Sequence, residues 1–378
     1  MNSIYILYDT YQPATAGTNH LLAYAKGLAE HGVCVTVFYL CPDKELSKID
    51  DSANLHHVYL WEQQRTKKYN KYSTSLFSLF RFMRLMKKDI PVFIMGVSIF
   101  LPLVCAKRGF KIYHERTEHP EVSGRMHGLI GNILFARYKK ILLKLDGLFV
   151  ISNNLRQCFI NDYGLDAQKV HVINMVVDSE RFWGLTKHHT ERYIAYCGTA
   201  SNNKDGVDQL IKAYAITARQ FPDVKLWIIG KTPDKGQEFA NKQLVQELGI
   251  EEKVNFTGII PSEQIPQVLM NAEILALDRP NNLQAKHGFP TKLGEYLLTG
   301  NPVAVTKVGD IPLFLQDGIS AVLAEPDKPE EFASKLNWLL EHPEEGRKIG
   351  DAGKKVALRE FNYLIESKKL YNHIFGNL

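Results

Sequence analysis

The sequence lacks the features that would place it in an oxidising compartment or among the serine hydrolases. Its 378 residues include only five cysteines, which are scattered and match no spacing of a metal or redox motif. A reducing cytoplasm is therefore the expected location. The first residues, MNSIYILYDT, have neither the basic region nor the cleavage site of a signal peptide. We find no Ser–His–Asp order, no nucleophile elbow and no Asp-x-Asp at an expected strand end, so sites built on these patterns are excluded.

One uncharged stretch has nearly the length of a membrane span. Residues 90–106 are seventeen uncharged residues, but Pro91, Gly96 and Pro102 interrupt them. A helix that crosses a membrane needs about 20 predominantly apolar residues. We therefore expect a buried strand followed by a helix in this segment.

The composition is that of a soluble globular protein, with 45% hydrophobic and 23% charged residues, and the length suits two domains. The formal net charge is only +5, and we expect no nucleic-acid partner. Basic residues are concentrated in two windows without Asp or Glu, at 65–88 and 125–144. Large apolar residues lie between them at helical spacing. This pattern fits helices on an anionic membrane surface, and it fits ordinary helices with an apolar face in the core.

Strand and helix signals alternate through both halves of the chain. The strands expected in the first half are 4–8, 33–40, 92–95, 110–114 and 147–151. Those expected in the second half are 193–197, 224–229, 254–256, 274–277 and 303–305. The main helices are expected at 19–30, 206–219, 328–341, 344–359 and 363–375. The alternation predicts an α/β protein with two doubly wound parallel sheets, joined by a polar loop around 176–190.

The segment GFPTKLGEYLLTGNPV, residues 288–303, carries the clearest signal for a ligand. Its Gly-Phe-Pro-Thr turn predicts a helix with Pro290 at the first helical position, and free amides at a helix start bind phosphate. Glu295 lies one turn further on the face of Thr291 and Lys292. Lys292 can reach a phosphate, while a carboxylate can accept the hydroxyls of a ribose. The segment therefore predicts a site for a nucleotide or a nucleotide sugar.

This segment resembles the donor-site signature of retaining GT-B glycosyltransferases of family four, the group 1 glycosyltransferases. Members carry Glu, seven residues, Glu, and a helix end with Gly-x-Pro-Val; Glu295 matches the second Glu, whereas His287 stands in place of the first. The resemblance covers nearly the whole chain. It implies two Rossmann-like domains that face each other across a cleft. These would be an acceptor-side domain at 1–180, a nucleotide-sugar domain at 181–360, and a terminal helix at 361–378 that packs on the first domain.

The resemblance also implies a set of donor-binding residues. The segment GTASNNKDG, from Gly198, is similar to the family's Gly-Arg … Lys-Gly region, whose two cations neutralise the diphosphate. Lys204 matches the Lys, but Thr199 occupies the Arg position. Gly17 also fits a helix-entry turn, Lys204 a solvated loop lysine, and His287 an ordinary loop histidine. The expected donor-binding residues are Gly17, Gly198, Thr199, Lys204, Gly258, Ile259, Arg279, His287, Gly288, Phe289, Pro290, Thr291, Lys292 and Glu295.

Three further residues are expected on the acceptor side. His114 lies at the end of the expected strand in KIYHERTEHP, and the resemblance implies that it is the family's histidine beside the reacting centre. Its titration range would make the site sensitive to pH. Glu118 and His119, in the same loop, are expected to contact the acceptor, although charged residues at a strand end are also common on surface loops. His114, Lys204 and Glu295 are then the expected catalytic residues.

The resemblance implies retaining transfer of a sugar, with a UDP- or GDP-sugar as donor and a glycan or lipid-linked acceptor. Such enzymes take part in the assembly of bacterial surface polysaccharide or glycolipid and need no essential metal or other cofactor. We expect a cytoplasmic protein, and the basic windows add peripheral contact with the inner face of an anionic membrane as an open alternative. The departures at Thr199 and His287 leave two further alternatives. One is an inactive GT-B subunit that binds a partner or a glycan, and the other is a GT-B nucleotide-sugar epimerase.

Overall fold

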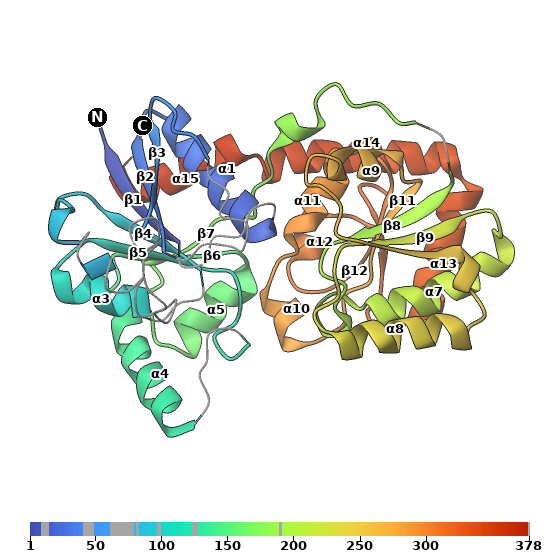
Figure 1. Cartoon of the computed structure of the whole chain (residues 1–378), viewed down its shortest axis with the longest axis horizontal. Coiled ribbons are helices and arrows are strands. Elements are labelled where there is room, and N and C mark those ends of the chain that lie inside the picture. The colour runs from blue at the N-terminus through green and yellow to red at the C-terminus, as the bar shows by residue number, and fades with distance from the viewer. Residues whose placement is uncertain are drawn as a thin grey trace, which may run out of the picture. The chain divides into compact units, whose positions relative to one another are not determined.

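A computed structural model describes residues 1–8, 15–40, 49–60, 79–80, 83–96, 100–122, 128–188 and 191–376. The chain forms two compact units, each drawn with its own sheet and helices in Figure 1. Unit 1 comprises Met1–Val176 together with Tyr363–Leu378, and unit 2 comprises Val177–Asn362. The second unit is thus inserted between two parts of the first. The sequence predicted boundaries at 180/181 and 360/361.

Unit 1 contains a seven-stranded parallel sheet. Its strands are β1 (Ser3–Tyr8), β2 (Cys34–Tyr39), β3 (Leu55–Tyr59), β4 (Val92–Met95), β5 (Ile112–Arg116), β6 (Gly147–Val150) and β7 (Val170–Val172). They lie in the order β3-β2-β1-β4-β5-β6-β7. Every residue of β4, β5 and β6 is buried, as expected for strands covered on both faces of a sheet. The edge strand β3 is mostly half-buried.

Unit 1 also contains helices whose bounds the structure describes. They are α1 (Ala16–Glu30), α3 (Phe100–Arg108), α4 (Gly128–Leu142), α5 (Asn153–Asn161) and α15 (Tyr363–Phe375). Helix α1 begins after Thr15, whose side-chain oxygen accepts a hydrogen bond from the Thr18 amide at 3.4 Å. Leu21, Tyr24 and Leu28 on its inner face are fully buried.

Helix α15 packs against α1 (Figure 1). Gly27 allows the two helices to approach closely, because a Cβ atom there would overlap the side chain of Ser367 and lie 2.9 Å from the Tyr363 carbonyl oxygen. Glu366 is completely buried and accepts a hydrogen bond from the Asn174 amide at 2.9 Å. Helix α15 is therefore part of the core of unit 1.

We expect Gly27→Val to destabilise unit 1 by about 1–3 kcal/mol, because the added side chain must push α15 away from α1. Thermal unfolding of the variant would measure this loss. Ala29→Val is the control, since Ala29 lies on the same helix but is only half-buried. An unchanged midpoint for Gly27→Val would contradict the close packing of α1 and α15.

Unit 2 contains a six-stranded parallel sheet. Its strands are β8 (Tyr193–Cys197), β9 (Lys225–Ile229), β10 (Val254–Gly258), β11 (Ile274–Leu277), β12 (Val303–Thr306) and β13 (Val322–Ala324). They lie in the order β10-β9-β8-β11-β12-β13. Its α-helices are α6 (Asn202–Asp205), α7 (Val207–Gln220), α8 (Lys235–Glu247), α9 (Ile265–Asn271), α10 (Leu283–His287), α11 (Thr291–Leu298), α12 (Ile311–Phe314), α13 (Pro329–Glu341) and α14 (Pro343–Glu360). Two short 3-10 helices are η2 (Ser179–Phe182) and η3 (Glu251–Lys253).

The strand order of unit 2 shows where a ligand would bind. Strands β8 and β11 are neighbours, and the chain runs from β8 to β9 on one side and from β11 to β12 on the other. In an open parallel sheet, the crevice outside the carboxyl ends of two such strands is the usual ligand site. The residues that follow Cys197 and Leu277 therefore lie at the position where the topology places a ligand.

The uncharged stretch at 90–106 forms β4 and then α3 over its described residues, which confirms the strand-and-helix prediction. Within the described part of the chain, no helix is both long and apolar enough to cross a membrane. Most of the basic window at 65–88 lies outside the described residues. In the second window, Phe135 and Tyr138 of α4 are buried, whereas Ile133 of α4 and Leu143 just after it are exposed.

Candidate functional site

The end of β8 lies under the side chain of Lys292 from α11. Gly198, the first residue after the strand, has a φ of +142°, and a Cβ atom there would lie 2.5 Å from the Lys292 Nζ. The Gly198 carbonyl group also approaches Gly230 so closely that a Cβ atom on Gly230 would overlap it. The chain therefore needs glycine at both strand ends, and the ammonium group of Lys292 is held directly above the first.

Lys292 belongs to a buried cluster of charged and polar groups. Its Nζ donates hydrogen bonds to an Asp205 carboxylate oxygen at 2.6 Å and to the Tyr196 hydroxyl at 2.7 Å. The Tyr196 hydroxyl in turn donates to Asp205 at 2.8 Å. Arg279, from the loop after β11, has its Nε 3.8 Å from the other Asp205 oxygen. Two cations thus converge on a carboxylate that is only 3% exposed.

The short helix α6 directs neighbouring side chains in opposite directions. The Ser201 side chain caps it by accepting a hydrogen bond from the Lys204 amide at 3.2 Å. Gly206 ends it with a φ of +63°, and a Cβ atom there would overlap the Asp278 carbonyl oxygen. Glycine is therefore required for this turn. As a result, Asp205 is buried in the unit while Lys204 is exposed.

The electrostatics of this cluster favour an anion. Burial opposes the ionisation of Asp205, but Lys292 and Arg279 outweigh it and lower the pKa of Asp205. Burial lowers the pKa of Lys292, Asp205 opposes this shift, and Lys204 adds to it. The three positive charges of Lys204, Arg279 and Lys292 outnumber the single negative charge of Asp205. The cluster therefore carries excess positive charge at the carboxyl ends of β8 and β11.

The start of α11 differs slightly from the prediction. Pro290 is the residue before the helix and not its first residue, because α11 begins at Thr291. Phe289 is buried with its ring centroid 5.3 Å from that of Phe314 and 5.4 Å from that of Phe361. This packing holds the turn that begins with the buried Gly288. The first turn of α11 carries Lys292 and presents the positive end of the helix dipole.

Glu295 lies one turn along α11 and is paired with Arg181 of η2. Arg181 also donates a hydrogen bond to the Ser262 carbonyl oxygen at 3.2 Å. Burial raises the pKa of Glu295, and the charge of Arg181 opposes that rise. The prediction did not include Arg181. No sequence signal connects it to Glu295, because the two residues lie far apart in the chain and pair only after folding.

The remaining donor-side residues lie in loops around the same sheet edge. Gly258 ends β10 with a φ of +67°, and its carbonyl oxygen accepts a hydrogen bond from the Gly230 amide at 2.9 Å. Ile259 follows with 76% of its surface exposed. The Thr199 carbonyl oxygen, next to Gly198, lies 2.6 Å from the Tyr196 hydroxyl oxygen, whose single proton it shares with Asp205. The last residue of α10, His287, is half-buried with its Nδ1 3.0 Å from a carbonyl oxygen one turn earlier in the helix.

In unit 1, His114 lies elsewhere in its strand than the sequence predicted. Strand β5 continues to Arg116 because Glu115 and Arg116 are buried with the strand, so His114 lies in its middle and not at its end. The histidine is 0% exposed, and its Nε2 is 3.4 Å from the Gly96 carbonyl oxygen. Burial, assisted by Arg116, lowers the pKa of His114 to about 3. It therefore stays neutral at physiological pH and does not supply the expected pH sensitivity.

Glu118 and His119 occupy the loop beyond the end of β5. His119 is buried, and its Nδ1 accepts a hydrogen bond from the Glu121 amide at 3.2 Å. Glu118 is half-buried. The prediction placed His114 where the chain leaves the strand. In the structure, His119 lies nearer to that point than His114 does.

A buried contact between a histidine and a carboxyl group in unit 1 was not predicted. His20 of α1 and Glu115 of β5 are both 5% exposed, and the His20 Nε2 is 2.8 Å from a Glu115 carboxylate oxygen. Gly17 lies at the start of the same helix, where a Cβ atom would be 2.7 Å from the Tyr8 hydroxyl. The glycine at this position thus accommodates the tyrosine that ends β1.

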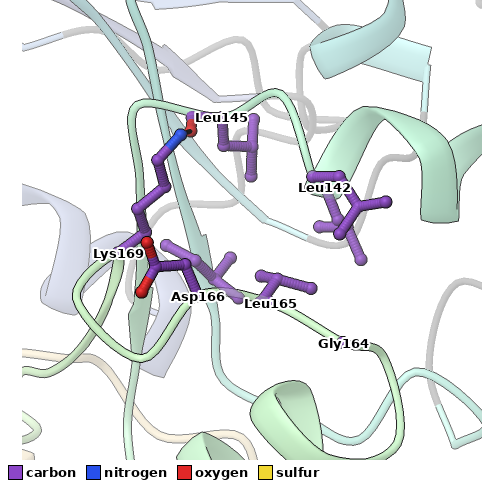
Figure 2. A pocket seen from close by; sticks show the side chains of 8 residues that line it. Leu142, Leu145, Gly164, Leu165, Asp166 and Lys169 are labelled. Carbon is purple, nitrogen blue, oxygen red and sulfur yellow. Dashed lines mark hydrogen bonds between the residues drawn. The ribbon is translucent and has the colours of Figure 1, made fainter.

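Two cavities lie away from these residues. One, of about 240 Å³, is lined in unit 1 by leucines from the end of α4 and by the loop before β7 (Figure 2). There the Lys169 Nζ donates a hydrogen bond to the Leu145 carbonyl oxygen at 3.0 Å. The other, of about 290 Å³, lies in unit 2 beside the ends of α7 and α8. Both border residues that precede strands, so neither belongs to the sheet edge with Lys292.

Asp278 is an unusual carboxyl group next to Arg279. It is 1% exposed, and neither carboxyl oxygen has a hydrogen-bond partner among the described residues. Burial raises the pKa of Asp278 to about 8, and the charges of Asp327 and Asp208 add to this effect. The folded protein therefore holds a proton at Asp278 that the unfolded chain releases near pH 4.

A raised pKa in the folded state makes the free energy of unfolding fall as the pH rises. Asp278 is expected to lower stability by about 1.4 kcal/mol per pH unit between pH 4 and pH 8. Asp278→Asn should therefore raise the unfolding midpoint at pH 8 more than at pH 5, as thermal unfolding at the two pH values would show. Asp223→Asn is a suitable control because Asp223 is exposed. An equal change at both pH values would contradict the raised pKa.

Two units, each with a parallel sheet and covering helices, are the architecture of the GT-B glycosyltransferases. Family models match both parts: Glycosyltransferase Family 4 matches residues 17–181, and Glycosyl transferases group 1 matches residues 178–356. The chain belongs to the group 1 glycosyltransferases.

Curated relatives are similar over part of their length. The chain is 26% identical over 226 residues to the MMP α-(1→4)-mannosyltransferase of Mycolicibacterium hassiacum, covering 60% of this chain and 53% of the relative. It is 28% identical over 201 residues to the D-inositol 3-phosphate glycosyltransferase of Segniliparus rotundus, covering 50% and 43%. The chain thus spans about half the length of these curated relatives.

Solved structures share the fold over the full chain. The sucrose-phosphate synthase of Thermosynechococcus elongatus has a TM-score of 0.75 at 16% identity, with 99% of each chain covered. Anabaena HepE in complex with UDP-glucose has a TM-score of 0.72 at 16% identity, with 98% of each chain covered. At this level of identity the likeness concerns the fold alone.

Proposed function

We propose that this chain transfers a hexose from a UDP- or GDP-sugar to a glycan or lipid-linked acceptor, with retention of configuration at the anomeric carbon. The observation that carries the proposal is the cluster of Lys204, Arg279 and Lys292 at the carboxyl ends of β8 and β11. A departing diphosphate needs positive charge at this point of the sheet. Arg279 and Lys292 supply positive charge there. Thr199, which occupies the family's Arg position, carries none.

The other residues take roles that follow from their positions. Glu295 accepts hydrogen bonds from the ribose, one turn along α11 from Lys292. Backbone groups at Gly258 and Ile259 contact the base, and His287 with the turn at Gly288 contacts the donor sugar. On the acceptor side, His119 and Glu118 follow the end of β5, so His119 takes the role expected of His114. We expect no metal requirement, because lysine, arginine and helix amides supply the positive charge.

The names of the relatives support these donor and acceptor classes. Several are named as mannosyltransferases or inositol phosphate glycosyltransferases. One is named as a GDP-mannose-dependent phosphatidylinositol monomannoside mannosyltransferase, and HepE has been solved with UDP-glucose. These names favour a hexosyl donor and a lipid-linked or phosphorylated acceptor. A role in bacterial surface polysaccharide or glycolipid assembly follows from such an acceptor.

The first experiment is a thermal-shift panel of UDP, GDP, ADP, CMP and dTDP with their common sugar conjugates. A ligand at a hundred times its dissociation constant adds about 2.7 kcal/mol to stability, which moves the midpoint by several degrees. The sugar conjugate of the responding nucleotide is then incubated with candidate acceptors, and the anomeric proton coupling of the product is read by NMR. Retained configuration supports the proposal, whereas inverted configuration contradicts it. The absence of any shift would favour an inactive binding subunit.

We further propose that α4 and the two residues after it contact the anionic inner face of a membrane. The exposed residues of this segment combine Ile133 and Leu143 with basic side chains, and the segment contains no acid. This is the composition of an interfacial helix. The exposed basic residues are Arg137, Lys139, Lys140 and Lys144.

Neutralising these four basic residues to Gln should weaken binding to vesicles with anionic lipid at least tenfold, since each basic residue near such a surface contributes about 1 kcal/mol. Flotation or sedimentation with vesicles measures the change. The control replaces four exposed lysines of unit 2, namely Lys235, Lys242, Lys328 and Lys348. Equal binding by the two variants would contradict membrane contact through α4.

A further inference from the structure

The positive cluster at the end of β8 contains an acid that a simple phosphate site would not need. Asp205 accepts hydrogen bonds from Lys292 at 2.6 Å and from Tyr196 at 2.8 Å, with Arg279 at 3.8 Å. Its exposed fraction is 3%, so the carboxylate is shielded from solvent. A buried carboxylate beside a phosphate repels it, because like charges interact strongly where little water screens them.

The geometry makes Asp205 the counter-ion of Lys292 and Arg279 when no ligand is bound. Without it, the half-buried Lys292 and the buried Arg279 would be two cations that lack this counter-ion, which is costly. The turn at Gly206 and the cap at Ser201 fix the short helix that carries Asp205. The position of the Asp205 carboxylate is therefore fixed by the backbone of this short helix.

We propose that Asp205 is a built-in counter-ion of the donor site, which pairs with Lys292 and Arg279 in the empty protein and competes with the diphosphate for Lys292 when a nucleotide binds. The inference rests on the proposed function. Asp205 is a positioning residue: it orients Lys292 above Gly198 and lowers affinity for the product nucleoside diphosphate. Its competition speeds the release of that product.

The charged and titratable groups around Lys292 come from several elements. They are Tyr196 and Cys197 of β8, Lys204 and Asp205 of α6, Arg279 after β11, and Glu295 of α11. Among these, Asp205 raises the pKa of Lys292. Removal of its charge should therefore shift the alkaline limb of the pH–rate profile to lower pH. A residue that only stabilises the fold would not move this limb.

The test is calorimetric titration of UDP, GDP and inorganic diphosphate into the full-length protein and two variants. Asp205→Asn keeps the shape of the side chain and removes its charge. Asp208→Asn is the control, because Asp208 lies in the first turn of α7 and pairs with Lys212 at 3.9 Å. We expect Asp205→Asn to bind the diphosphate-containing probe roughly three- to tenfold more tightly, with a larger dependence of affinity on salt, because the site then carries more net positive charge. The control should be unchanged.

Unchanged or weaker binding by a folded Asp205→Asn variant would overturn the inference. If the wild-type protein binds none of the probes, the proposed function fails and not only the role of Asp205. If Asp205→Asn does not fold, the double variant Asp205→Asn/Lys292→Gln removes both charges of the pair. It should fold and bind the probe at least tenfold more weakly than wild type, whereas wild-type affinity would overturn the inference.

Discussion

Lys292→Met is expected to lower kcat/KM for the nucleotide-sugar donor at least hundredfold, or about 2.7 kcal/mol of transition-state stabilisation. The reason is its position: its ammonium group lies above Gly198, where the topology of unit 2 places a ligand. Charge develops on the leaving diphosphate in the transition state, so a fixed cation there acts on the rate and not only on binding. Steady-state kinetics with the donor from the thermal-shift panel measure the change.

The control for this variant is Lys335→Met. Lys335 is another lysine of unit 2 with a carboxylate partner, Asp317, at 2.8 Å. It lies on α13, outside the cluster. Its replacement should leave kcat/KM within about twofold of wild type, because a twofold change is well under 1 kcal/mol. Near-normal kinetics of Lys292→Met, with unfolding midpoints that match wild type, would exclude Lys292 from the donor site.

Glu295→Ala is expected to reduce turnover at least tenfold, equivalent to about 1.4 kcal/mol or more. The carboxylate is expected to hold the ribose hydroxyls, and its loss also removes the ion pair with Arg181. The effect should be larger with a ribonucleotide sugar than with its 2′-deoxy analogue, because the analogue has already lost one hydroxyl contact. Kinetics with the two donors measure this difference.

Glu273→Ala is a matched control for Glu295→Ala. Glu273 also pairs with an arginine, Arg192, at 2.8 Å, but on the surface of unit 2. It should show wild-type kinetics and, as a surface pair, a change in stability of about 1 kcal/mol or less. If Glu295→Ala has the same kinetics as this control, Glu295 is not a donor contact.

The central strands of both units could be predicted from the sequence. The strands at 92–95, 193–197 and 274–277 have the predicted bounds, because each is a short apolar run between polar or glycine-containing turns. Three strands were missed, namely β3, β7 and β13. All three lie at an edge of their sheet, where a strand needs no long apolar run because it has a neighbour on one side only.

The candidate site was predictable only where neighbouring residues define it. The turn and helix at 288–298 could be recognised because their signal is local. The pairs Lys292–Asp205 and Glu295–Arg181 could not, because each joins residues that are distant in sequence. His114 was misplaced for a related reason: the charged residues that follow it look like surface residues, but folding buries them and extends the strand past the histidine.

The route of the chain through α15 has a consequence for biosynthesis. Unit 1 lacks a core helix until residues 363–375 have been made, because α15 packs against α1. Glu366 of α15 also accepts the hydrogen bond of the Asn174 amide. Unit 2 is contiguous, and all of it is synthesised before α15. The amino-terminal part must therefore wait, incompletely packed, for the unit that follows it. Chaperone dependence and early degradation should accordingly concentrate in the part of the chain that is synthesised first.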